Sequence, residues 1–309
     1  MRDLLSYIIK RFGWMLITLW IVYSVSFVLM RSVPGNPFSS ERNVPPAIER
    51  QLKARYNLDA PPIEQYVDYL VGIVTRFDLG WCIRLEDYSV NQVLAEGFPV
   101  SASLAIFALV FAIVLGVSAG VVSAVYRGSF ADVSMMAAAV LGIAIPNFVL
   151  ASLAILLFVF GIQIFPAGGW GTLRQVALPA LCLGAPVAAY IARLTRAGML
   201  EVMTRDHVRT AFAKGLPRHT VITRHVLPGA MLPVVSYLGP ATASVLTGSL
   251  VLEKIFALPG MGSHFIYAAT QRDYTLAMGM VLTYTVILFI MNSLVDISYS
   301  IIDPRVKLQ

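Results

Sequence analysis

The sequence predicts an all-α polytopic membrane protein with six transmembrane helices and a small helical insertion between the first and the second. Its 309 residues are 58% hydrophobic and only 13% charged, whereas a soluble domain carries about 25% charged residues. A helix that spans a bilayer needs about 20 largely apolar residues, and six segments meet this condition with no Asp, Glu, Lys or Arg in their cores. These segments are 12–30, 99–126, 133–164, 176–192, 227–252 and 274–295.

The first apolar segment is predicted to be a retained anchor. It follows the stretch MRDLLSYIIKR, but its apolar part is longer than the ~7–15 residues of a secretory signal. The third segment is the longest, and Gly161 and Pro166 are predicted to end its helix. In the second segment, Gly116 and Gly120 form a GxxxG pattern, which favours close helix packing over ligand binding.

The distribution of Lys and Arg predicts the orientation, because these residues are enriched in short cytoplasmic loops. The connection between the fourth and fifth segments is the most basic, with Arg193, Arg196, Arg205, Arg209, Lys214, Arg218 and Arg224. The connection after the third segment has Arg174 alone, and the basic residues after the fifth are balanced by Glu253 and Asp273. With six spans, both termini lie on the side of the basic connection and are predicted to be cytoplasmic. The net charge of +6 is explained by this placement and predicts no nucleic-acid partner.

The segment 31–98 is predicted to be an extracytoplasmic helical insertion. Pro45–Pro46 and Pro61–Pro62 each precede an amphipathic apolar spacing, and proline is favoured where a helix starts. Two helices that cap the outer mouth are one interpretation, and a packed loop with no partner-binding role is the alternative.

Searches for catalytic, metal and nucleotide motifs find none. GxxxxGK[ST], HExxH and GxSxG are absent, and the histidines form no ligand cluster. Cys82 and Cys182 suggest neither a metal site nor a disulfide framework, although their pairing stays open. The predicted spans contain no ionisable group before Asp296, which disfavours a self-sufficient secondary carrier. An intramembrane enzyme is disfavoured too, so a transporter of this kind must be driven by another protein.

The basic connection at 199–228, named here the knob, is predicted to form two short helices. Glu201 and Arg205 suit an i, i+4 ion pair, Gly215 suits a helix C-terminus, and Pro217 can open the next helix. Small residues such as Ala211 would allow another protein to approach the backbone. An anchor that lies on anionic lipid headgroups carries equal weight on physical grounds.

The stretch RTAFAKGLPRHTVITRHVLP resembles the signature EAA-x3-G-x9-I-x-LP of binding-protein-dependent ABC importer permeases. Arg209, Thr210 and Ala211 stand at the EAA position, Gly215 at the glycine and Leu227-Pro228 at the final dipeptide. The resemblance extends over nearly the whole chain, to the inner-membrane B subunit of oligopeptide importers, the peptide branch of this family. The stretches that carry it are, in chain order, RSVPGNPF, YNLDAPPIEQYVDYL, IPNFV, PAGGW, IARLTRAGMLEV, LPGMG and NSLVDISYSIIDPRVKL.

The resemblance implies a type I ABC importer permease in a bacterial inner membrane. Its partners would be a second homologous permease subunit in a heterodimer, two ATP-binding subunits, an extracytoplasmic peptide-binding protein and membrane lipid. ATP and Mg would bind the ATPase subunits, so no cofactor is expected in this chain. The domains would be 1–30 with the first helix, 31–98 as the insertion, 99–302 as the permease core and 303–309 as the cytoplasmic tail.

The resemblance also assigns the knob as the coupling helix that docks on an ATPase. The docking residues implied are Arg209, Thr210, Ala211, Lys214, Gly215, Leu216, Pro217 and Arg218. For the substrate path, the small and apolar fifth segment offers Ser236, Thr242 and Thr247, with Gly239–Pro240 predicted to loosen its helix. Ordinary helix–helix hydrogen bonding is the favoured alternative for these three. LPGMGSHF is predicted to form a re-entrant turn and a short helix.

Overall fold

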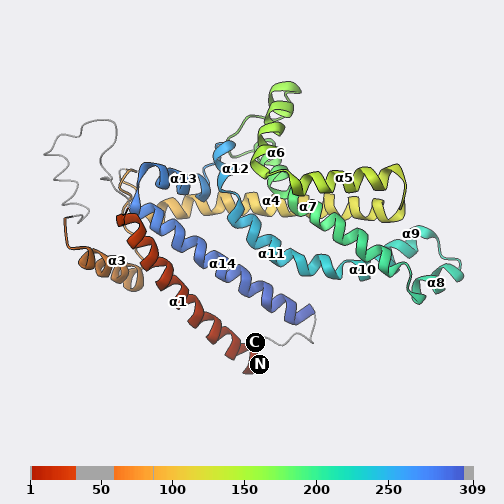
Figure 1. Ribbon diagram of the computed structural model, residues 1–309, viewed down its shortest axis with the longest axis horizontal. Coiled ribbons are helices and arrows are strands. Elements are labelled where there is room, and N and C mark those ends of the chain that lie inside the picture. The colour runs from red at the N-terminus through yellow and green to blue at the C-terminus, as the bar shows by residue number, and fades with distance from the viewer. Residues whose placement is uncertain (1, 33–58, 86, 303–309) are drawn as a thin grey trace. The chain divides into compact units, whose positions relative to one another are not determined.

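The computed structural model describes residues 2–32, 59–85 and 87–302. Within these ranges the chain is helical and has no β-strand, apart from an isolated bridge between Trp81 and Ser89 (Figure 1). It divides into two compact units. The first contains Met1–Val100 and Pro259–Ile290, and the second contains Ser101–Leu258 and Met291–Lys307.

The long helices agree in outline with the apolar pattern. The helices are α1 (Arg2–Ser32), α3 (Pro62–Arg76), α4 (Val90–Val125), α5 (Phe130–Ala144), α6 (Asn147–Ala154), the π-helix η1 (Ile155–Gly161), α7 (Leu173–Val202), α8 (Asp206–Ala213), α9 (Arg218–Val221), the π-helix η2 (Ile222–Val226), α10 (Leu227–Ala230), α11 (Leu232–Gly248), α12 (Leu250–Ile255), α13 (Met261–Gln271) and α14 (Tyr274–Ile302).

By length and composition, four helices of the described chain can cross a membrane unbroken: Tyr7–Ser32, Val90–Val125, Leu173–Val202 and Tyr274–Ile297. Two further pairs pass the same test together but are bent. Phe130–Ala144 and Asn147–Gly161 meet at 112°, and Arg218–Ala230 and Leu232–Gly248 meet at 51°. The count becomes six if each bent pair is one span.

The third predicted span is broken, which corrects its interpretation as one straight helix. Pro146 follows Ile145, whose backbone is extended with φ −85° and ψ 123°. The proline ring disfavours the helical region for the residue before it, so α5 stops and α6 starts in a new direction. The predicted end at Gly161 is confirmed, because η1 ends there.

The fourth and fifth spans also differ from their predicted bounds. The fourth is longer, since α7 runs from Leu173 to Val202 and includes Arg193 and Arg196, which the sequence placed in the connection. The fifth bends at Met231, between α10 and α11. Gly239–Pro240 was predicted to loosen it, but both residues lie inside the continuous helix α11.

In the first unit, α3 packs against α1 through aromatic residues. Tyr23 is 2% exposed; its hydroxyl donates to the Tyr66 carbonyl oxygen at 2.6 Å, and its ring stacks with that of Tyr69 at 5.9 Å. The second predicted insertion helix is confirmed as α3, with proline in its first turn. The first, over residues 48–56, lies outside the described residues. α13 confirms the short helix predicted after LPGMG.

Cys82 lies in the core of the first unit and is 1% exposed. Burial raises the pKa of its thiol to about 12, with a smaller contribution from the Asp273 carboxylate. Because the thiolate is the reactive form, we expect the native protein to resist labelling of Cys82 by a maleimide at pH 7.5. Mass spectrometry should find the label at this residue only after denaturation. Neither Cys82 nor Cys182 forms a disulfide bond.

In the second unit, α4 and α7 approach each other at glycines. A Cβ added at Gly116 would lie 2.6 Å from the Ala188 carbonyl oxygen, and one added at Gly120 would lie 2.6 Å from that of Ala192. The GxxxG pattern therefore serves close helix packing, as predicted. α5 joins the same layer, because a Cβ at Gly142 would lie 3.2 Å from Cβ of Ala189.

Candidate functional site

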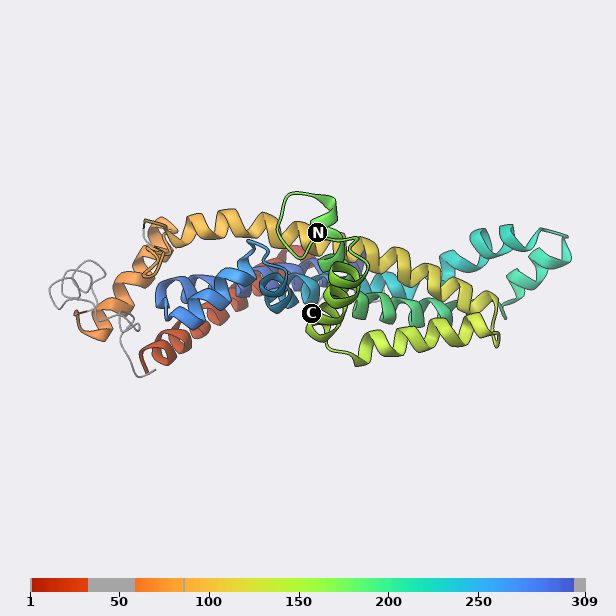
Figure 2. The same ribbon diagram turned by 90° about the horizontal axis from the view of Figure 1, so that it is seen from above.

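The knob extends beyond the ends of α4 and α5 in the second unit (Figure 1, Figure 2). A turn at Met203–Arg205 separates α7 from α8, so α8 is a helix of its own. The predicted i, i+4 pair is confirmed, with Arg205 Nη2 2.7 Å from Glu201 Oε1. Both side chains are more than half exposed, so this pair contributes little to stability.

Gly215 ends α8 through its backbone conformation. Its φ is +76°, in the left-handed region that favours glycine. Its N–H donates to the Phe212 carbonyl oxygen at 2.9 Å, and the Leu216 N–H donates to that of Ala211 at 3.4 Å. This is the Schellman arrangement, which satisfies carbonyls that the helix end leaves open. Pro217 then precedes α9, as predicted.

The inner face of the knob is an apolar core. Val208, Ala211, Val221 and Val226 are each less than 5% exposed and pack with residues of α4, α7 and α10. On the side of α4, Arg218 Nη2 donates to the Val125 carbonyl oxygen at 2.8 Å, near the end of that helix. The knob is therefore attached both to α7, from which its chain continues, and to α4.

The outer face of the knob contains most of the predicted docking residues. Arg209, Thr210, Lys214, Gly215, Leu216, Pro217 and Arg218 are exposed. Ala211 is 4% exposed, because its side chain faces the apolar core of the knob, and its part in docking stays a prediction. Sequence reasoning missed Phe212, which is 49% exposed. Aromatic residues and arginine are enriched at protein–protein interfaces.

The knob histidines form no metal site. His207 Nε2 lies 3.3 Å from the carbonyl oxygen of His225. In the part of the chain that the structure describes, no group of three or more His, Cys, Asp or Glu residues could hold a metal ion.

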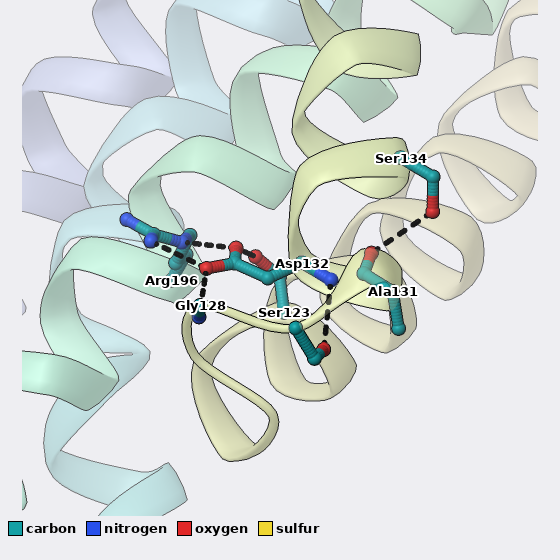
Figure 3. Close-up of polar contacts among 7 residues, drawn as sticks. Ser123, Gly128, Ala131, Asp132, Ser134 and Arg196 are labelled. Atoms are coloured by element: carbon teal, nitrogen blue, oxygen red, sulfur yellow. Dashed lines mark hydrogen bonds and ion pairs between the residues drawn. The ribbon is translucent and has the colours of Figure 1, made fainter.

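A buried carboxylate lies at the base of the α4–α5 hairpin, and sequence reasoning missed it. Asp132 is 4% exposed. Its oxygens accept from Arg196 Nε at 2.8 Å and Nη2 at 2.9 Å, from the Gly128 N–H at 2.9 Å and from the hydroxyl of Ser123 (Figure 3). The carboxylate thus joins α4, the turn, α5 and α7. Asp132 directly precedes the predicted third span.

Glu253 is a second buried carboxylate at a helix end. Its exposure is 0%, and its Oε1 accepts from the hydroxyls of Ser101 at 2.7 Å and Ser249 at 2.6 Å. It directly follows the predicted fifth span, where its negative charge was counted against the basic residues of the next connection. The predicted lack of ionisable groups thus applies to the span cores and fails at their ends.

The candidate path residues of α11 bond within their own helix. Thr242 Oγ1 donates to the Leu238 carbonyl oxygen at 2.7 Å, and Thr247 Oγ1 donates to that of Ala243 at 2.9 Å. Both threonines and Ser236 are partly buried. The hydrogen bonds of these two threonines therefore stay within α11 and do not join it to another helix.

The helices, the bent spans and the knob define a class: a polytopic helical membrane protein with the fold of ABC transporter permeases. Two solved structures share this fold. An amino acid ABC transporter matches with a TM-score of 0.53 and 18% identity over 70% of this chain and 95% of that one. The MetNI methionine ABC transporter matches with a TM-score of 0.52 and 20% identity over 67% of this chain and 97% of that one.

Family models account for most of the chain. Residues 112–308 match the binding-protein-dependent transport system inner membrane component, and residues 4–105 match the N-terminal model of such membrane components. The chain belongs to this family of binding-protein-dependent transport system permeases.

Curated relatives cover almost the full length. The dipeptide transport system permease protein DppB of Bacillus subtilis is 47% identical over 98% of both chains. The oligopeptide transport system permease protein OppB of Escherichia coli is 40% identical over 98% of this chain and 100% of that one. The resemblance inferred from the sequence motifs is confirmed.

Proposed function

We propose that this chain is the transmembrane permease subunit of an ATP-driven, binding-protein-dependent importer of peptides, and that it forms half of the translocation path. The observation that carries the proposal is its identity of 47% and 40% with dipeptide and oligopeptide permeases over nearly the whole of each chain. Since relatives of both kinds match, the proposed substrate class is short peptides.

The proposed complex contains a second homologous permease subunit, two ATP-binding subunits and an extracytoplasmic peptide-binding protein, embedded in the bacterial inner membrane. ATP and Mg would bind the ATPase subunits. This division is supported by the sequence, which contains no phosphate-binding GxxxxGK[ST] motif.

The knob is proposed to be the coupling element, on the cytoplasmic side with both termini. Its exposed face combines Arg209, Lys214 and Arg218 with the apolar side chains of Phe212 and Leu216, a composition that suits a protein groove better than lipid headgroups alone. Closure of the ATPases would displace the knob, and α7 and α11 would then switch the cavity between inward- and outward-facing states. Ser236, Thr242 and Thr247 remain the proposed path residues.

The test is transport by the complete complex in proteoliposomes, with its binding protein and a radiolabelled dipeptide or pentapeptide. The expected result is uptake that requires ATP and is lost when the ATPase subunits are omitted. Uptake by this chain alone, driven by a proton gradient, would favour the secondary carrier instead. A complex whose ATP hydrolysis responds to no peptide would contradict the proposed substrate class.

A further inference from the structure

The Asp132 carboxylate is a single contact point for separate parts of the second unit. Arg196 of α7 approaches both of its oxygens in a bidentate geometry, and each oxygen accepts one further hydrogen bond, from the Ser123 hydroxyl of α4 or from the Gly128 N–H of the turn (Figure 3). Ser123 is 0% exposed and the Arg196 side chain is 29% exposed. A planar bidentate pair fixes both distance and orientation, which apolar packing does not.

Backbone contacts along the same helices prevent them from sliding independently. Gly116 and Gly120 of α4 lie against the carbonyls of Ala188 and Ala192 in α7, and Gly142 of α5 lies against Ala189. Close-packed surfaces of this kind have discrete arrangements and move as blocks. The glycine contacts, however, are van der Waals approaches to backbone atoms and are weakly directional, so the Asp132–Arg196 pair sets the register at the end nearest the knob.

The knob is joined to the same block. Its apolar core includes Ala124 of α4 and Met199 of α7, and Arg218 donates a hydrogen bond to the carbonyl oxygen of Val125. Arg196 lies in α7, the helix from which the knob chain continues, and Asp132 lies in the first turn of α5. A displacement of the knob therefore reaches α5 through Arg196 and Asp132.

We propose that the Asp132–Arg196 pair is a positioning pair that transmits the movement of the knob to the α4–α5 hairpin, and through the break at Pro146 to α6. This inference rests on the proposed function, because it assumes that the knob is displaced by ATPases. It assigns to α5 and α6 an active part in switching, in addition to α7 and α11.

The Asp132→Asn variant tests the pair in the complete reconstituted complex. The amide oxygen can still accept from the Gly128 N–H, and Arg196 is exposed enough to be hydrated, so the fold should survive. We expect the number of peptides transported per ATP hydrolysed to fall at least about fivefold, the lower end of the usual coupling between distant sites. Recovery of the intact complex and its melting temperature should stay close to those of the wild type.

Ser134→Ala is the matched control, because it removes a side-chain hydrogen bond of α5, from the Ser134 hydroxyl to the Ala131 carbonyl oxygen at 3.1 Å, that stays within the helix. It should leave the transport ratio unchanged. A normal transport ratio in Asp132→Asn would overturn the proposal, and so would a ratio that falls only together with loss of the intact complex, since that outcome indicates a purely structural role.

A distance measurement separates this inference from the proposed function. Spin labels at Val140 of α5, which is 56% exposed, and at Arg224 of the knob, also exposed, report whether the two move together. In the complex with Cys82 and Cys182 replaced by alanine, the distance distribution should stay narrow and unchanged between nucleotide-free and ATP-trapped states, and should broaden in Asp132→Asn. A wild-type distance that changes between the states would refute rigid transmission, whether or not the substrate is a peptide.

Discussion

Replacing Gly120 with valine is expected to prevent stable folding of the second unit. A Cβ at this position would lie 2.6 Å from the Ala192 carbonyl oxygen and 2.6 Å from the Thr195 Cβ, far inside van der Waals contact. The Ala192 oxygen belongs to the backbone of α7 and cannot rotate away. Overpacking of a core usually costs about 1–3 kcal/mol, and a clash with a helix backbone should reach or exceed the upper figure.

The measurement is the fraction of purified protein that elutes as a single species in detergent, together with its thermal unfolding midpoint. Gly120→Ala should already lower the midpoint, and Gly120→Val should abolish the monodisperse fraction. Gly248→Ala is the control, because a Cβ there has no heavy atom within 4 Å. If Gly120→Val behaved like Gly248→Ala, the close approach of α4 and α7 would be wrong.

The apolar pattern predicted where the long helices lie and what type they are, because lipid imposes a length and composition that the sequence displays directly. It could not predict the bends. Residues 133–164 read as one apolar run, and only the local conformation of Ile145 before Pro146 turns the chain by 112°. The bend at Met231 lies just before Pro233, in the first turn of α11, where a proline cannot donate a hydrogen bond to the preceding turn.

The knob was predictable because its signals are local. A glycine with positive φ and a proline at a helix start act on their own neighbours, so Gly215 and Pro217 lie where the sequence placed them. Asp132 and Glu253 were not predictable, since their partners Arg196 and Ser101 are distant in sequence. The inward position of Ala211 likewise depends on which face of α8 packs against α4 and α7.

Replacing Gly215 with valine is expected to weaken coupling to the ATPases while leaving the bulk of the chain folded. A Cβ at this position has no heavy atom within 4 Å, but φ of +76° is strained for a β-branched residue. A left-handed conformation costs an L-residue about 1–2 kcal/mol. If the ATPases bind only the knob conformation with a left-handed residue at 215, the cost of this strain lowers the affinity of the permease for the ATPases about tenfold.

Gly215→Asn separates backbone strain from the loss of glycine itself, because asparagine enters the left-handed region more readily than other residues. Peptide-stimulated ATP hydrolysis and recovery of the ATPases with the permease should therefore fall strongly in Gly215→Val and only slightly in Gly215→Asn, with similar thermal unfolding midpoints for both. Equal loss in the two variants would mean that the partner contacts the bare backbone at this residue. No loss in either would mean that the turn between α8 and α9 is not part of the docking surface, and the coupling role of the knob would then have to rest on its basic and aromatic side chains alone.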